Sequence, residues 1–519
     1  MRQPFNPTDE ASTVALSQSP QGSVGTALAV ALILLLALFL IYGAALHTVY
    51  LFADETWLFD EEARQRGLAH AMFEYTRGFG RPLTAPIHFA FSHAILFGEE
   101  GMLALRWVQF LCSFAMAFVF YGLLRRLGLQ TLTALLLTVF IWSQPGFAIR
   151  HFYAHTATSW APALASLLAF WLVLDERSPL RAPASLLLAF GLFLAGFFTT
   201  QVAPFYCAGL IALATLQDKS LAHWPACRNL FLALMAAFGA YLVFYFVARY
   251  GLGWFTYRGG TRFALTPEAL SVFEFWNYPI RSSLSRGQVQ LLCALVGGLW
   301  LLTLLAAFMG EKEPLEVRLK RWGLALACVG STFIVVVADG ASGRQHLFLA
   351  AIPAVVLTGW FALHSLMSTN RWLKAAGLVL VVVVMIGAAR SFPRDLVQPA
   401  AKMLSYIQTS VTVTDTPPET PLTVLMPPKD TWEGICVGQP CGGFYARQFQ
   451  LPFHLAWSHY YTSAMRLSGV PWQRPIVFEQ ATPERPLDAA AYVIDWPAYL
   501  EQETCLGNLT PLGYLCKER

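Results

Sequence analysis

The chain contains 519 residues, of which 56% are hydrophobic and only 13% are charged. Since a soluble domain is typically about 25% charged, this composition excludes an ordinary soluble protein and indicates an integral membrane protein. The formal net charge of +4 is small and scattered along the chain, so we expect no nucleic acid partner.

The N-terminal tail, residues 1–23, is polar and rich in Ser, Thr, Gln and Pro. It lacks the short basic stretch and the cleavage site that a signal peptide carries. We therefore expect this tail to be cytoplasmic, and we expect the apolar run that follows it to stay in the membrane as an anchor.

A membrane-spanning helix needs about 20 mostly apolar residues. The segment TAPIHFAFSHAILFG is too short and too rich in His to span, and we predict an amphipathic or re-entrant piece there. About eleven other runs are predicted to span: 24–50, 103–124, 131–149, 157–174, 183–200, 201–217, 229–250, 288–309, 322–338, 345–366 and 373–389. The sequence thus predicts a mainly α-helical, polytopic membrane bundle over residues 24–389.

The basic residues set the predicted orientation. Before residue 400 the lysines are Lys219, Lys312, Lys320 and Lys374, and each falls in a short connection that also carries Arg. Cytoplasmic loops are enriched in Lys and Arg, so these connections and the N-terminus should be cytoplasmic. Eleven spans then place the C-terminal tail outside, and we expect a bacterial inner membrane with this tail in the periplasm.

The C-terminal tail, residues 390–519, has the composition of a separate domain. The runs PLTVLMPP, RPIVFEQ and AAYVIDW are rich in β-branched and apolar residues and are bounded by Pro or charge, which predicts short buried strands. The run FYARQFQLPFHLAWSHYYTSAMRL is long enough for a helix, although Pro452 interrupts it. We expect a small extracytoplasmic α/β domain.

This tail also contains four cysteines, Cys436, Cys441, Cys505 and Cys516. An even number of cysteines in one polar segment indicates disulfides and an oxidising compartment, in agreement with the predicted orientation. Pairing of neighbours is one of three connectivities, and a zinc site is the alternative.

The predicted outward loops carry the polar side chains. The first loop, about residues 51–102, begins with the acidic pair Asp54-Glu55 directly after the first span. Arginine is suited to phosphate because its planar, permanently charged guanidinium donates two parallel hydrogen bonds. Candidate phosphate ligands in these loops are Arg81, Arg258, Arg262, Arg344 and His346, and candidate substrate contacts are His88, His151 and His155.

The stretch GRPLTAPIHFAFSHAILFGEEGMLALRWVQFLCSFAMAFVFYGLLRRLGL resembles the early region of the GT-C glycosyltransferases of the protein mannosyltransferase and aminoarabinose transferase type. That family typically shows an acidic pair after the first span, a His-Pro-Pro-Leu-like segment, an FG, an ALR and a span ending in paired basic residues. The matching pieces are Asp54-Glu55, Pro82-Leu83, Phe97-Gly98, Ala104-Leu105-Arg106 and Arg125-Arg126. The likeness covers most of residues 24–390 as a layout with sparse motifs. It implies a polyprenyl-phosphate-sugar donor, a glycolipid, glycan or protein acceptor on the outer side, and a first-loop acid at the centre.

The chain departs from the family pattern at two places. Gly80-Arg81 stands where the family has His-Pro, and the segment beginning at His155 lacks the second carboxylate that relatives often carry there. A metal site shared between two loops is therefore not supported, and we expect no cofactor.

The chemistry can be argued without the family. A sugar linked to a phosphate already has a good leaving group, whereas the acceptor hydroxyl benefits from a base on the opposite face of the anomeric carbon. Asp54, with Glu55 beside it, is the predicted general base of an inverting transfer. Fixed arginines opposite this base would stabilise the charge that collects on the departing phosphate.

Two other functions fit parts of the pattern, and the acidic pair could also simply end the first span. A polymerase or ligase of lipid-linked glycans also has arginine-rich outward loops, but it would not need an acidic pair directly after the first span. A transporter or flippase usually places charges near mid-membrane and shows repeated halves. The predicted spans are nearly free of acidic residues and show no such repeat.

Overall fold

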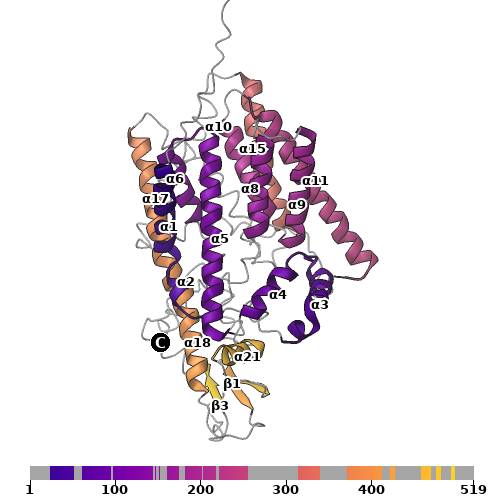
Figure 1. Cartoon of the computed structure of the whole chain (residues 1–519), viewed down its shortest axis with the longest axis vertical. Coiled ribbons are helices and arrows are strands. Elements are labelled where there is room, and N and C mark those ends of the chain that lie inside the picture. Colours follow the sequence, from indigo (N-terminus) through magenta and orange to yellow (C-terminus); the bar gives the residue numbers. More distant parts are fainter. Residues whose placement is uncertain are drawn as a thin grey trace, which may run out of the picture.

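The computed structural model describes residues 24–51, 61–94, 97–143, 147, 151, 160–174, 182–200, 203–217, 221–254, 314–338, 371–411, 421–426, 458–468, 475–480 and 492–496. Most of these residues are helical, and the long helices run roughly side by side (Figure 1). Predicted spans 288–309 and 345–366 lie outside the described residues.

Within the described residues, helices cover nine of the predicted spans, which confirms these nine as helical. They are α1 (Val24–Tyr42), α5 (Gly98–Arg126), α6 (Thr131–Trp142), α8 (Trp160–Leu174), α9 (Ala182–Thr199), α10 (Tyr206–Gln217), α11 (Trp224–Phe246), α15 (Leu315–Ala338) and α17 (Arg371–Phe392). By length and composition, four of the described segments could cross a membrane: Val24–Tyr42, Gly98–Arg126, Trp224–Gly251 and Arg371–Arg390. The total of about eleven spans stays a prediction.

Two groups of helices meet at α5. On one side α1 packs against α5, α6 and α17, and on the other side α9 packs against α8 and α11 while α10 packs against α15 (Figure 1). Contacts between α5 and α8 join the groups.

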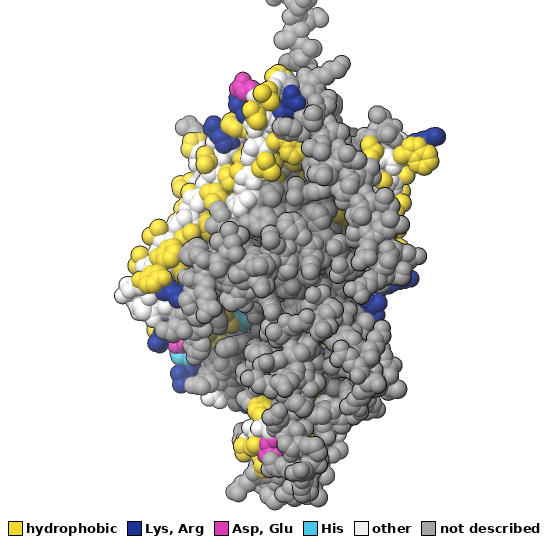
Figure 2. Space-filling model, turned by 180° about the vertical axis from the view of Figure 1, so that it is seen from behind, with side chains coloured by type: hydrophobic (Ala, Val, Ile, Leu, Met, Phe, Trp, Pro, Cys, Tyr) yellow, Lys and Arg dark blue, Asp and Glu magenta, His cyan; other side chains and the backbone are white. Residues whose placement is uncertain are grey.

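Figure 2 shows hydrophobic side chains across much of the described surface of the bundle, with Lys and Arg toward its ends. This is the distribution expected for helices whose middle part faces lipid.

The first predicted span is broken near its end. Helix α1 stops at Gly43, and the short helix α2 (Ala44–His47) follows. A side chain at Gly43 would meet the carbonyl oxygen of Phe39 at 2.5 Å, so the tight turn requires glycine. Thr48 then leaves the helix in an extended conformation, and the chain reaches Tyr50 and Leu51 as a buried, non-helical segment.

Helices α3 (Glu61–Phe79) and α4 (Ala85–Ala94) lie below the ends of α8, α9 and α11 and beside the lower part of α5 (Figure 1). Helix α4 falls within the segment predicted to be too short to span, and the structure confirms that its helix has only 10 residues. The turn between α3 and α4 is attached to the end of α9, because the Leu83 N–H donates to the Phe198 carbonyl at 3.4 Å and the Thr84 hydroxyl donates to the Thr199 carbonyl. The α3–α4 pair is therefore fixed to the bundle.

The C-terminal strands lie where the sequence predicts them. Strands β1 (Leu422–Met426), β2 (Ile476–Gln480) and β3 (Tyr492–Asp495) form a parallel sheet in the order β2-β1-β3. Helix α21 (Ser458–Leu467) is the described part of the predicted helical run. The chain enters this region without leaving helical structure, because α17 continues through a π-helical segment (Pro393–Val397) into α18 (Gln398–Ser410). The proposed domain boundary at residue 390 thus falls inside a continuous helix.

Candidate functional site

The exit of the first span is held by buried polar side chains from two distant parts of the chain. Arg106 of α5 is only 1% exposed, and its Nη2 donates to the Tyr50 carbonyl at 3.0 Å. The guanidinium carbon also lies 3.5 Å from the centre of the Tyr50 ring, a cation–π contact. On the next residue, the Leu51 carbonyl accepts a hydrogen bond from the Tyr460 hydroxyl of α21 at 3.3 Å. Two successive carbonyl groups, three to four residues before Asp54, are therefore fixed by side chains.

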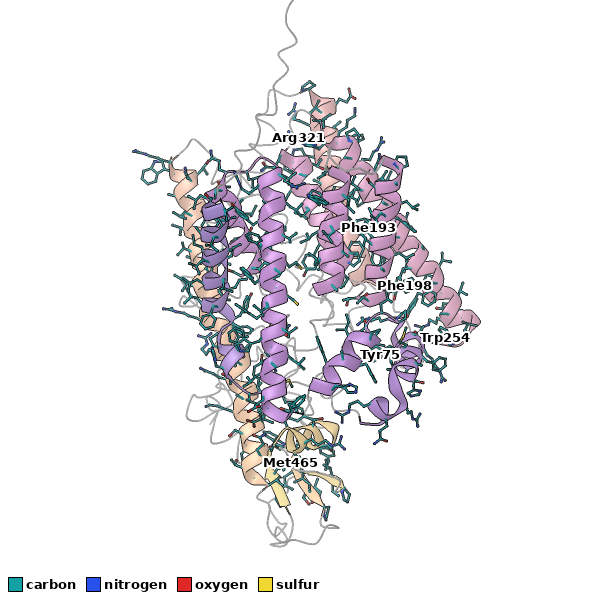
Figure 3. The ribbon with its side chains drawn as sticks, viewed as in Figure 1. Tyr75, Phe193, Phe198, Trp254, Arg321 and Met465 are labelled. Atoms are coloured by element: carbon teal, nitrogen blue, oxygen red, sulfur yellow. The ribbon has the colours of Figure 1, made fainter. Side chains whose placement is uncertain are left out.

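The α3–α4 pair brings two of the predicted site residues together. The Tyr75 hydroxyl and Nδ1 of His88 are 2.6 Å apart and share a hydrogen bond. Burial, and then the nearby positive charge of Arg81, lower the pKa of His88 from its ordinary value to about 4. His88 is therefore neutral at pH 7 and can exchange hydrogen bonds with a neutral hydroxyl. Figure 3 labels Tyr75 below Phe198, which lies in the last turn of α9, and Trp254, which follows α11.

His151 lies in a different environment. It is 4% exposed, and its ring stacks on the Tyr42 ring with 3.7 Å between the ring centres. Its Nε2 is hydrogen-bonded to the Ser113 hydroxyl at 2.8 Å, and the same hydroxyl oxygen accepts from the Trp142 indole N–H at 3.0 Å. These contacts explain how the polar His151 side chain is accommodated in the bundle interior. They favour a structural role for His151 over the predicted contact with substrate.

The other predicted site residues lie outside the described residues, so their arrangement stays a prediction. They are Asp54, Glu55, His155, Arg258, Arg262, Arg344, His346, Cys436, Cys441, Cys505 and Cys516.

The described part of the chain contains no group of three or more His, Cys, Asp or Glu side chains that could hold a metal ion. Its cysteines are Cys112, Cys207, Cys227 and Cys328, and none of these four forms a disulfide. Three of them are buried among apolar helices, as expected for thiols that act as small apolar groups.

Sequence reasoning missed the roles of Arg106 and Tyr460. Arg106 was noted only as part of a family motif, although an arginine inside an otherwise apolar span is itself a signal, because burying a charge is costly unless the fold uses it. Tyr460 gave no such signal, since its partner Leu51 is 409 residues away in the sequence. Only packing reveals this contact.

The arrangement has one chemical consequence. The exit of the first span, Arg81 with neutral His88, and the C-terminal sheet all lie toward one end of the bundle (Figures 1 and 3). Arg321, by contrast, lies at the opposite end and caps α10 through the Thr215 and Leu216 carbonyls. A cation, a neutral hydrogen-bonding imidazole and the chain that leads to an acidic pair therefore share one end of the molecule. A guanidinium can pair with an anion, and a neutral imidazole can form a hydrogen bond with a hydroxyl group.

Comparisons with known proteins found no matching family model, no matching curated protein and no matching solved structure.

Proposed function

We propose that the chain is an integral membrane glycosyltransferase of the GT-C type. It moves a sugar from a polyprenyl-phosphate-linked donor to a glycolipid, glycan or protein acceptor on the outer face of the membrane, with inversion at the anomeric carbon. Asp54 is the general base, and Glu55 supports it. Arg81, Arg258, Arg262, Arg344 and His346 bind the donor phosphate.

The observation that carries this proposal is the fixed exit of the first span. Asp54 follows Leu51 by three residues, so covalent geometry keeps their Cα atoms within about 11 Å of each other. Leu51 is fully buried and held by Tyr460, and Tyr50 before it is held by Arg106. A general base must be positioned to within hydrogen-bond reach of the hydroxyl that it deprotonates. The segment before Asp54 is held in place, as a general base requires. An acidic pair that only ended the span would not need this support.

The α3–α4 pair supports the same proposal. Its turn is fixed to the end of α9, so Arg81 in this turn has a defined position. His88 is neutral beside Arg81, so it can accept or donate a hydrogen bond to a sugar hydroxyl without adding charge. His155 is a second candidate for such a contact. His151 is left out because its ring is packed against Tyr42.

The test begins with a mass-spectrometric comparison of envelope glycolipids and glycoproteins from cells with and without the gene. A missing single sugar identifies the transferred group and the acceptor. A change in glycan length instead would indicate a polymerase or ligase. Loss of the transferase should leave its lipid-linked donor on the outer side of the membrane, so accumulation of that lipid on the cytoplasmic side would indicate a transporter.

The catalytic assignment is then tested with Asp54→Asn and its matched neighbour Glu55→Gln. Losing a positioned base typically costs about 10²–10⁴ in rate, so Asp54→Asn should abolish detectable transfer at equal expression. Glu55→Gln should be milder, because adjacent side chains point in different directions. Unchanged product in Asp54→Asn would refute the assignment of the base.

A further inference from the structure

One C-terminal helix contacts both ends of the first outer loop. At the beginning of this loop, the Tyr460 hydroxyl of α21 donates to the Leu51 carbonyl at 3.3 Å. At the start of α5, the position that a Cβ on Gly98 would occupy lies 3.4 Å from the Leu467 carbonyl oxygen, at the other end of α21. Figure 3 shows Met465, which lies between these two contact residues, beneath the end of α5.

These contacts are part of a packed interface. Tyr460, Met465 and Leu467 are each about 1% exposed or less, and Leu51 is equally buried on the opposite side. Helix α21 packs against both α5 and α18. Because water is excluded from such an interface, a polar contact within it restricts the backbone more than the same contact at a surface.

Helix α21 is in turn fixed from behind by the parallel sheet. The Trp496 indole N–H, directly after β3, donates to the Tyr461 hydroxyl at 2.7 Å. The Trp496 ring also packs on Tyr406 of α18, with 5.3 Å between ring centres. Neighbouring tyrosines of α21 thus have separate partners: Tyr460 contacts the exit of the first span, and Tyr461 contacts the sheet.

We propose that α21 fixes both ends of the first outer loop through Tyr460 and Leu467, and we call this pair of contacts the staple. The C-terminal segment is then part of the loop's structural support, and Tyr460 is a positioning residue. The contribution to catalysis rests on the function proposed above, whereas the staple itself does not. Tyr460 and Arg106 fix successive carbonyl groups, so the staple completes the support that α5 provides. The C-terminal segment then sets where the acidic pair begins, from a position 409 residues later in the chain.

The first test compares Tyr460→Phe with Tyr461→Phe in the full-length protein, in lipid nanodiscs. Each variant loses one buried hydroxyl from the same helix. Hydrogen–deuterium exchange is measured in peptides that cover residues 44–51 and residues 492–496. A net hydrogen bond is typically worth a factor of about five in a local opening equilibrium, so Tyr460→Phe should raise exchange about fivefold in residues 44–51. Tyr461→Phe should raise it in residues 492–496 instead.

The second test does not depend on how well the phenylalanine variants fold. A photoreactive p-benzoylphenylalanine at position 460 should cross-link to the peptide that contains Leu51, and the same residue at position 461 should cross-link to the peptide that contains Trp496. Unchanged exchange in residues 44–51 of Tyr460→Phe, or no cross-link from position 460 to that peptide, would overturn the staple.

The positioning role is read from kinetics. If transfer is detected in the wild type, Tyr460→Phe should lower kcat several-fold with little change in KM, because the donor contacts are intact while the base is less well placed. Equal kcat in Tyr460→Phe and the wild type would overturn the positioning role. A wild type without transferase activity would refute the proposed function, while exchange and cross-linking would still decide the staple.

Discussion

The contacts of Ser113 allow a stability prediction with a matched control. Ser113 of α5 is fully buried, and its hydroxyl links two groups outside its own helix, the Trp142 indole N–H at 3.0 Å and His151 Nε2 at 2.8 Å. Ser166 of α8 is equally buried, but its hydroxyl donates to the Pro162 carbonyl of its own helix at 2.8 Å and only at 3.4 Å to the Ala203 carbonyl outside it. The same substitution to alanine should therefore have different effects at the two positions.

The expected magnitude follows from the number of hydrogen bonds lost. Hydrogen bonds between membrane helices are worth about 0.6 kcal/mol on average and up to about 1.7 kcal/mol. Ser113→Ala removes two of them, so it should lower the free energy of unfolding by about 1–3 kcal/mol. In Ser166→Ala the Pro162 carbonyl can still accept the helical N–H bond, so the change should be about 0.5 kcal/mol or less.

Equilibrium unfolding in mixed micelles with an increasing fraction of SDS measures both changes. Tryptophan fluorescence is a suitable signal because Trp142 itself loses a hydrogen bond in Ser113→Ala. Equal destabilisation by the two substitutions, or a change below about 0.5 kcal/mol for Ser113→Ala, would contradict the packing role that we assign to His151 and would restore it as a candidate substrate contact.

Three further predictions address charge and orientation. The pKa of His88 is about 4 in the folded chain and about 6.5 in the unfolded chain. The unfolded chain therefore binds the proton more tightly, and the stability of the fold should decrease as pH falls from 6.5 toward 4. His88→Gln should flatten this part of a plot of melting temperature against pH, and identical plots for the variant and the wild type would contradict the lowered pKa. Arg321→Ala removes the buried donor to two carbonyls at the end of α10 and should cost about 2–4 kcal/mol in the free energy of unfolding. Lys320→Ala removes an exposed ion pair with Glu316 and a distant contact with the Trp224 ring, and it should cost less than about 1 kcal/mol. Comparable losses in chemical unfolding would argue against the capping role. An alkaline phosphatase fusion after Arg519 should be active, because eleven spans from a cytoplasmic N-terminus leave the C-terminus outside; an inactive fusion at normal expression would mean that the span count is wrong by one.

The helices and strands could be predicted because they depend on local properties of the chain. A run of about 20 apolar residues must satisfy its backbone hydrogen bonds internally when it lies in lipid, so length and composition nearly determine the helix. The three strand runs of the tail were recognisable for a similar reason, since their β-branched and apolar residues are bounded by Pro or charge. The sequence did not predict the break at Gly43, where the turn brings the chain too close to Phe39 for any side chain.

The candidate site was predictable only in part. Residue types suited to phosphate could be selected from the loops, and Arg81 and His88 do lie together in the structure. The separation of His88 from His151 was not predictable, because both are histidines near the predicted ends of spans. One is bonded to Tyr75 on the α3–α4 pair, and the other is stacked on Tyr42 within the bundle.

By itself the sequence indicated the class of the protein, the positions of nine membrane helices, α4, α21 and the three strands, and the kinds of side chain that its loops offer, but it did not indicate α3 or α18. Only the tertiary structure decided the strand order β2-β1-β3, the burial of Arg106 over Tyr50 and the contact of Tyr460 with Leu51. The physical reason is that hydrophobicity and backbone preference act over a few turns of chain. A contact between residues 409 positions apart depends instead on how whole helices pack, and no local pattern encodes that geometry.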